Sequence, residues 1–332
     1  MVEIEDKKLE GYTFIDLFAG IGGFRLGLES LGAKCVFSSE IDEEAASVYE
    51  KNFGERPYGD ITQIKEEDVP DHDILCAGFP CQAFSASGKK LGFADSRGTL
   101  FFDVARIVKH KRPKVVFMEN VMYMVMHDEG RTLAVVQGTM KELGYNFYYQ
   151  VLNAADYGVP QQRKRLYMVA FREDLPVDSF LFPLPVPLTK RVKDIMVDDE
   201  EQVKSQYVNR EYYLPTRKPK VNYNEVILVG FINKAGQGER IYNPEGVSIT
   251  LSTGNKAIFT TTPDLQRPRR LIPRECARLM GFPDSYELAK VPTTAHHQLG
   301  NSVVVDVIQY IAMQIARFIN DEPEELVLTP MF

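Results

Sequence analysis

The sequence predicts a doubly wound α/β fold built on a mixed sheet, followed by a smaller, irregular and β-rich domain. Two observations carry the first part of this prediction. Short apolar runs typical of buried strands alternate with amphipathic helical runs, and two β-rich stretches, 145–152 and 165–171, close the series. The second domain is predicted because the helical rhythm stops between about 190 and 284, where the pattern favours strands.

The first strand, 13–18, runs into a glycine turn and then a helix. The turn covers 19–23, and the helix places Phe24, Leu28 and Leu31 on one face. Glycines let the backbone approach a ligand closely, and a helix N-terminus offers unpaired N–H groups. This order is typical of nucleotide-binding sites, although many αβ units use such a turn for packing alone.

The second strand, 34–39, ends in an acidic residue. Glu40 lies 24 positions after Asp16, about where this fold places an acid that accepts hydrogen bonds from ribose hydroxyls. Asp42 then begins a helix as its N-cap. After another turn, Asp60 could accept a hydrogen bond from an amine.

A third apolar run, 74–77, breaks into Gly78, Pro80 and a loop of small residues that ends at Gly88. Cys81 follows the proline directly, at the strand end where open α/β sheets bind ligands. A thiolate in that position would be a strong nucleophile. The alternative interpretation is a small buried cysteine without a chemical role.

The rest of the chain continues this pattern. A strand at 114–118 carries Glu119 at its end, and a basic turn with Arg163 and Arg165 precedes the last strand of the series. Prolines at 183, 185 and 187 indicate a linker. Further helices are expected at 100–108, 133–143, 273–280 and 303–319.

Composition indicates a soluble globular protein of 332 residues, with 44% hydrophobic and 26% charged residues. Because the N-terminus is charged, we expect no secretory signal, and no apolar run is expected to approach a membrane span. The four cysteines form no CxxC pair, so we expect reduced thiols and a cytoplasmic location. A metal site from His72, Cys76 and Cys81 is not expected, because Cys76 lies inside an apolar strand.

Charge alone does not identify the partner. The net charge of −7 argues mildly against nucleic acid, but acidic runs can offset basic clusters that lie elsewhere. Three such clusters occur, at 163–165, 217–220 and 267–270.

Six motifs in order make the sequence similar to a known family. FIDLFAGIGG, GFPCQAFSASG, MENV, GVPQQRKR, RECARLMGFP and GNSV resemble the DNA cytosine-5 methyltransferases, in particular the small bacterial restriction–modification enzymes of the HhaI type. The resemblance runs from Thr13 to Ile319. It implies an S-adenosylmethionine-dependent methyltransferase fold, with a catalytic domain at 1–190, a target-recognition domain at 191–284 and a C-terminal segment, 285–332, that returns to the catalytic domain.

The resemblance also implies a donor, S-adenosylmethionine, and no metal. Relatives often have tryptophan after the ribose-binding acid, whereas this chain has Ile41, so its donor affinity is expected to be lower. The donor-binding residues expected on this basis are Asp16, Phe18, Gly20, Gly23, Glu40, Ile41, Asp60, Ile61, Pro80, Leu100, Asn301 and Ser302.

The implied acceptor is a cytosine flipped out of duplex DNA. Cys81 would add to carbon 6 of the ring, and protonated Glu119 would hydrogen-bond N3. Arg165 would stabilise the carbonyl oxygen, and Arg163 would orient Glu119 or the thiolate. Alone, each of these residues has an ordinary structural interpretation, including a helix N-cap for Asn301 and Ser302.

The DNA contacts implied by the resemblance lie in two loops and one threonine-rich run. Gln237, between two glycines, would enter the vacated space and pair with the orphan guanine, and Ser87 would meet it from the other side. Arg240 would read a guanine or hold a phosphate, and Thr250 is a further expected contact. We also expect a monomer, no membrane association and a cognate restriction endonuclease.

Three alternatives remain open from the sequence. An NAD-dependent oxidoreductase would share the glycine turn and Glu40 but would not need Cys81. The acceptor could instead be tRNA, as in one branch of the family. The third alternative is a DNA-binding module without catalytic activity. The presence of Cys81, Glu119 and Arg165 argues against it.

Overall fold

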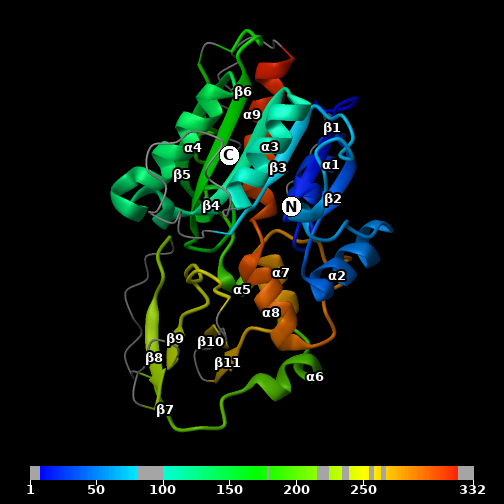
Figure 1. Ribbon diagram of the computed structural model, residues 1–332. Helices are drawn as coiled ribbons and strands as arrows, with labels where there is room; N and C mark the ends of the chain where they lie inside the picture. The colour runs from blue at the N-terminus through cyan, green and yellow to red at the C-terminus, as the bar shows by residue number, and fades with distance from the viewer. Residues whose placement is uncertain are drawn as a thin grey trace.

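The computed structural model describes residues 8–80, 100–177, 179–214, 224–233, 239–253, 258–262 and 267–320. Within these residues the chain forms a six-stranded sheet and a five-stranded sheet, with helices α7 and α8 lying between them in Figure 1. Cys81, Ser87 and Gln237 lie outside the described residues.

The large sheet has the order β2-β1-β3-β4-β6-β5. Strands β1 to β4 are parallel, and β6 is antiparallel to both of its neighbours, which confirms a mixed sheet. The chain leaves β1 for β2 on one side and returns to β3 on the other, so the order reverses at β1. Ligands of open α/β sheets bind at such a reversal. The strands are β1 (Thr13–Leu17), β2 (Lys34–Ser39), β3 (Ile74–Ala77), β4 (Val115–Val121), β5 (Tyr145–Asn153) and β6 (Lys164–Arg172).

Alternating side chains of the large sheet supply two hydrophobic layers. Phe14 and Phe117 pack with α1 and α9 on one face, while Ile15 and Val116 pack with α3 and α4 on the other. Gly27 lets α1 and α9 approach closely, because a Cβ there would lie 2.5 Å from Cγ2 of Ile308. The helices are α1 (Gly23–Glu29), α2 (Glu43–Phe53), α3 (Leu100–Lys111), α4 (Arg131–Glu142) and α9 (Val305–Ile319). The short 3₁₀ turns are η1 (Ile61–Gln63), η2 (Met122–Val125), η3 (His127–Gly130), η4 (Ala154–Asp156) and η5 (Lys204–Gln206).

The C-terminal part contains a helix that was not predicted from the sequence. α8 (Pro292–Asn301) precedes α9, and Asn301 and Ser302 therefore end α8 rather than capping the last helix. Pro292–Ile319 is apolar and long enough to cross a membrane by length and composition, so the expectation that no run approaches a span is wrong. The physical reason is that this segment, which α8 and α9 divide, packs in the core: 61% of its apolar 18-residue window is buried inside the protein.

The smaller sheet has the order β11-β10-β9-β8-β7 and its own apolar cluster, which includes Ile232, Ile241 and Phe259. The predicted β-rich second part is thus confirmed, with short strands because turns interrupt it often. Its elements are α5 (Val192–Ile195), α6 (Glu200–Val203), β7 (Tyr212–Tyr213), β8 (Leu228–Ile232), β9 (Arg240–Tyr242), β10 (Phe259–Thr261), β11 (Pro268–Arg270) and α7 (Pro273–Arg278).

A buried ion pair joins the smaller sheet to α7. The two terminal nitrogens of Arg269 on β11, Nη1 and Nη2, donate to the carboxylate of Glu275 at 2.9 and 2.6 Å. Cys276 and Met280 nevertheless pack in the large core. The end of the second domain at 284 therefore stays a prediction.

Candidate functional site

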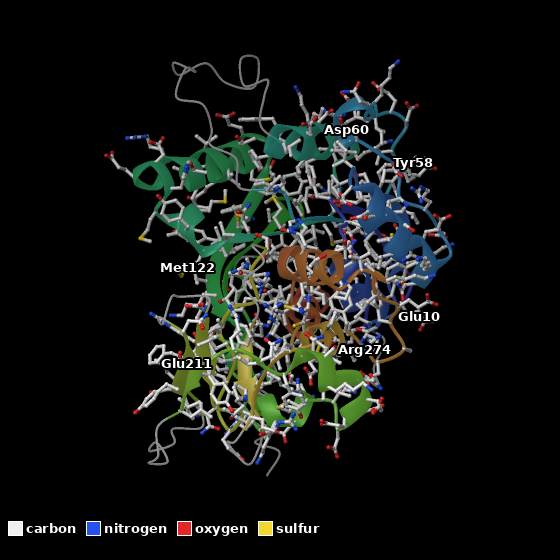
Figure 2. The ribbon with its side chains drawn as sticks, turned by 90° about the horizontal axis from the view of Figure 1, so that it is seen from below. Glu10, Tyr58, Asp60, Met122, Glu211 and Arg274 are labelled. Atoms are coloured by element: carbon white, nitrogen blue, oxygen red, sulfur yellow. The ribbon has the colours of Figure 1, made fainter. Side chains whose placement is uncertain are left out.

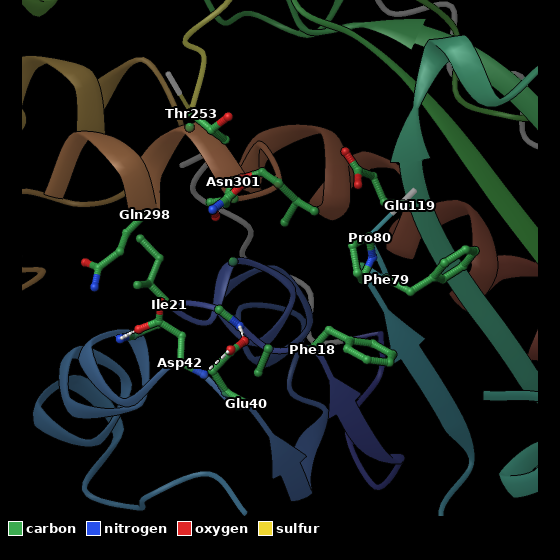
Figure 3. A pocket seen from close by; sticks show the side chains of 18 of the residues that line it. Phe18, Ile21, Glu40, Asp42, Phe79, Pro80, Glu119, Thr253, Gln298 and Asn301 are labelled. Atoms are coloured by element: carbon green, nitrogen blue, oxygen red, sulfur yellow. Dashed lines mark hydrogen bonds between the residues drawn. The ribbon is translucent and has the colours of Figure 1, made fainter. Parts of the chain in front are cut away.

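A cavity of about 610 Å³ opens at the carboxyl ends of β1 to β4. Its size is that of a site for a small organic ligand. The sequence-predicted residues that line it are Phe18, Gly20, Gly23, Glu40, Ile41, Asp60, Ile61, Pro80, Leu100, Glu119, Arg163, Arg165, Thr250, Asn301 and Ser302. Figure 3 shows Glu40 and Glu119 at different parts of this cavity.

The turn after β1 forms the floor of the cavity and has unusual backbone geometry. Phe18 has φ of 57°, a left-handed value that non-glycine residues rarely adopt, and Gly20 has φ of 55°. Gly23 must lack a side chain, because a Cβ would lie 2.7 Å from Cγ2 of Val303. Strain of this kind is typical of functional sites, and here it folds the turn against the cavity.

Glu40 holds the turn from the end of β2. Its Oε2 accepts a hydrogen bond from the Gly20 N–H at 2.7 Å, and its Oε1 accepts one from the Asp42 N–H at 2.8 Å. Burial raises the pKa of this carboxyl above its ordinary value, while the two backbone bonds oppose that shift. The carboxylate keeps further lone pairs, so a hydroxyl-bearing ligand could also donate to it.

Ile41, Asp60 and Ile61 form the wall next to Glu40. The Ile41 side chain is 68% exposed, whereas Ile61 is 3% exposed. Asp60 caps η1, since its Oδ1 accepts from the Thr62 N–H at 2.9 Å. Asp60 lies close to Tyr58 in Figure 2, with Met122 on the other side of the molecule.

Asp16 does not line the cavity, unlike the other predicted donor-binding residues. It lies in β1 opposite Cys76 and is fully buried, and neither carboxylate oxygen has a hydrogen-bond partner in the described part of the chain. Burial raises its pKa to about 8, while the charge of Arg25 opposes the shift. Its place is therefore beneath the glycine turn, in the core.

Glu119 and Arg165 come together because β4 and β6 are antiparallel neighbours. Val121 pairs with Arg165 and Glu119 with Tyr167, so the two charged side chains lie on the same face, two residues apart. Nε of Arg165 lies 3.2 Å from Oε1 of Glu119. Burial raises the pKa of Glu119, and the charges of Arg165 and then Arg163 oppose the shift.

Arg163 is 2% exposed, and its two terminal nitrogens bond backbone oxygens. Nη1 donates to Leu251 at 2.7 Å, and Nη2 donates to Gly300 and Ser302 at 2.9 and 2.8 Å. Its Nε has no partner among the described residues. Arg163 thus fastens the segment around Leu251 and the end of α8 to the start of β6.

The backbone before Cys81 is held by a residue that the sequence analysis did not assign. Nδ2 of Asn120 donates to the backbone oxygen of Phe79 at 2.8 Å, and Asn120 is 2% exposed. Pro80 lies on the cavity wall, next to Glu119 in Figure 3. The structure therefore brings the residue before Cys81 to the same end of the cavity as Glu119.

The remaining DNA-contact candidates lie in different places. The Thr250 hydroxyl lines the cavity and donates to the backbone oxygen of Gln162 at 2.5 Å. Arg240 is exposed at the start of β9 and does not line the cavity.

The wall opposite Glu40 contains residues that sequence reasoning missed. Thr253, His297, Gln298 and Gly300 all line the cavity. His297, Gln298 and Gly300 were missed because α8 was not predicted and only its end belongs to a recognised motif. Thr253 lies outside the recognised motifs. Among the described residues no group of three or more His, Cys, Asp or Glu side chains could hold a metal.

The family profile of the C-5 cytosine-specific DNA methylases matches residues 12–317. The chain belongs to this family. It is 53% identical to the type II methyltransferase M.HhaI of Haemophilus parahaemolyticus, over 97% of this chain and all of that one. It is 43% identical to the type II methyltransferase M.HpaII of Haemophilus parainfluenzae, over 92% and 89% of the two chains.

Solved structures confirm the fold of this methyltransferase. The Dnmt2 methyltransferase of S. pombe superposes with a TM-score of 0.71 at 22% identity, over 92% of this chain and 98% of that one. A putative DNA modification methyltransferase from an E. coli prophage gives 0.70 at 22% identity, over 93% and 100%. The enzyme therefore methylates DNA at carbon 5 of cytosine, and the oxidoreductase interpretation is set aside.

Proposed function

We propose that this enzyme binds S-adenosylmethionine at the Glu40 end of the cavity and a flipped-out cytosine of duplex DNA at the Glu119 end. The observation that carries the proposal is the single cavity, which unites the glycine turn, Glu40, Pro80, Glu119 and Arg165. Binding both substrates in one pocket converts a bimolecular reaction into an effectively unimolecular one.

The residues at the Glu40 end fit the donor. The carboxylate of Glu40 is fixed by two backbone N–H groups and retains lone pairs for the ribose hydroxyls. Ile41 and Ile61 offer apolar surface to the adenine, and Asp60 offers an acceptor to its amine. Phe18, Gly20 and Gly23 bring the backbone close, with Asn301 and Ser302 across the cavity. When bound, the donor supplies an electrophilic methyl group on a sulfonium.

Cys81 is the proposed nucleophile. Carbon 5 of cytosine is too weakly nucleophilic to accept a methyl group unaided. Addition of the Cys81 thiolate to carbon 6 turns the ring into an enamine, whose carbon 5 is nucleophilic. Once carbon 5 carries the methyl group, a base, such as a bound water, removes the carbon 5 hydrogen, and the thiolate leaves as the ring double bond re-forms. Support comes from Pro80, the preceding residue, which lies on the cavity wall.

Glu119 and Arg165 stabilise the charge that this addition creates. Negative charge develops toward N3 and the carbonyl oxygen of the ring. Glu119, whose pKa is raised by burial, donates to N3 in its protonated form, and Arg165 stabilises the carbonyl oxygen. The Nε of Arg163, which no described residue accepts from, is available to Glu119 or the thiolate.

The duplex is proposed to lie between the cavity and the smaller sheet. Gln237 and Ser87 would fill the space left by the flipped base, Arg240 would contact a guanine or a phosphate, and Thr250 would contact the DNA from the cavity rim. We further propose a monomer, without a bound metal, that acts in the cytoplasm alongside a cognate restriction endonuclease.

The test is bisulfite sequencing of DNA from cells that express this chain, with Cys81→Ser as the control. We expect 5-methylcytosine at one short recognition sequence with the wild-type enzyme and none with the variant, because a serine hydroxyl is almost wholly unionised at neutral pH. Methylation of tRNA but not DNA, or full activity of Cys81→Ser, would contradict the proposal.

A further inference from the structure

His297 lies one helical turn before Asn301 on α8, and both line the cavity. Nδ1 of His297 lies 3.0 Å from the backbone oxygen of Thr253, and its Nε2 lies 3.1 Å from Nδ2 of Asn301. A carbonyl oxygen only accepts, so Nδ1 carries the proton. Nε2 of the neutral ring then offers a lone pair, and the Asn301 amide must turn its NH₂ group toward it.

This arrangement leaves Oδ1 of Asn301 without a hydrogen-bond partner among the described residues. We infer that His297 is a positioning residue for the methyl donor, which fixes the Asn301 amide so that Oδ1 serves as an acceptor on the cavity wall. The inference rests on the proposed donor site. An acceptor there suits the ammonium group of the donor's amino-acid part, which carries N–H bonds and a positive charge.

The same imidazole joins two walls of the cavity. The segment 251–253 packs closely on the end of α8, since a Cβ on Gly300 would lie 2.7 Å from the backbone oxygen of Ser252. Arg163 bonds this segment at Leu251, and His297 bonds it two residues later, at Thr253. His297 therefore holds the part of the wall that directly faces Asn301, and its loss would free both the segment and the amide.

The experiment measures binding of S-adenosylhomocysteine by calorimetry and the donor KM in DNA methylation. His297→Leu should weaken S-adenosylhomocysteine binding about three- to tenfold, the range for one orienting hydrogen bond, and the loss should appear in donor KM rather than in kcat. His297→Gln should restore most of the affinity, because its amide can donate to Thr253 and accept from Asn301.

The neighbouring residue gives a matched control. The ring nitrogens of His296 lie 2.7 Å from the Pro292 oxygen and 3.2 Å from the Leu271 oxygen, and His296 does not line the cavity. His296→Leu should therefore leave donor affinity at the wild-type value.

A double-mutant cycle with Asn301→Ala decides whether His297 acts through Asn301. We expect His297→Leu to cause little further loss once Asn301 is alanine, because the two residues act as one unit. The inference would be overturned if His297→Leu bound the donor analogue as tightly as the wild type, if His297→Gln restored no affinity, or if the two losses were fully additive. The proposed function would survive each of these results, provided that the wild-type enzyme still bound the analogue and methylated DNA. A wild-type enzyme that bound no S-adenosylhomocysteine would instead overturn the donor site itself.

Discussion

At one end of the cavity Glu40 accepts hydrogen bonds from two backbone N–H groups, whereas at the other end Glu119 faces the guanidinium of Arg165. Glu40 directly follows β2, Glu119 lies within β4 two residues before its end, and burial raises the pKa of both carboxyls. Backbone amides hold Glu40 as a fixed acceptor. Among the described residues Glu119 has one ion-pair contact, with Arg165 at 3.2 Å, which leaves it freer to exchange a proton.

This difference suits the Glu40 end to binding of the donor and the Glu119 end to the chemical step. A fixed acceptor is suited to binding, where the same contact serves the ground state and the transition state. A buried carboxyl with a raised pKa is suited to proton transfer, because it keeps its proton to a higher pH than an ordinary carboxyl does. Substitutions at the Glu40 end should therefore change donor affinity, and those at the Glu119 end should change the rate of the chemical step.

The largest effect is expected at Glu119. Glu119→Gln keeps the shape and a donor amide but cannot deliver a proton, so the single-turnover rate should fall by roughly 10²–10⁴. Donor affinity should stay close to that of the wild type. An equal single-turnover rate in the variant would remove the chemical role of Glu119.

The pH dependence sharpens the same point. In the proposed mechanism the protonated form of Glu119 is the active one, and burial raises its pKa. The contribution of Glu119 to the rate should therefore be complete below that raised pKa and be lost as pH rises through it. The rate of Glu119→Gln should lack this alkaline decline. A decline of the same shape in both enzymes would assign the titration to another group.

A smaller effect is expected at Glu40. Glu40→Gln replaces one carboxylate oxygen by an NH₂ group, which cannot accept from the Gly20 or the Asp42 N–H. Loss of charged hydrogen bonds should weaken S-adenosylhomocysteine binding by about 10- to 100-fold, with little change in kcat at saturating donor. Glu67→Gln, on an exposed residue away from the cavity, is the control. A lower kcat in Glu40→Gln without weaker S-adenosylhomocysteine binding would contradict the assignment of Glu40 to donor binding.

The smallest effect is expected at Ile41, whose exposed side chain lines the cavity at the proposed donor site. Ile41→Phe offers a flat ring to the adenine and should tighten donor binding by about two- to tenfold, the range for an aromatic contact. Calorimetry with S-adenosylhomocysteine measures this directly. Unchanged or weaker binding would mean that the adenine does not lie against residue 41.

The Glu40 end was predictable because its parts are close together in the sequence. A strand, a glycine turn and a helix leave little freedom in where Phe18, Gly20 and Glu40 lie, and the structure places all three on the cavity wall. Asp16 was expected in the same set but lies in the core, because strand alternation turns it away from the cavity.

The Glu119 end and the α8 wall depend on contacts between distant segments. Nothing local in the sequence indicates that Arg163 bonds the oxygens of Leu251 and Gly300, or that Asn120 holds Phe79. The contact of His297 could not be predicted for the same reason, because its partner Thr253 lies 44 positions away. The family motifs indicated which charged residues to propose for the site, but not the contacts that position them.

In the proposed mechanism one cavity brings the methyl donor to a cytosine held by Cys81. The most direct test incubates the enzyme with S-adenosylmethionine and duplex DNA that carries 5-fluorocytosine at the target, where the hydrogen to be removed is replaced by fluorine. Mass spectrometry of the trapped complex should find a methylated cytosine covalently attached to Cys81. No adduct, an adduct on another residue, or an adduct without the methyl group would contradict the account.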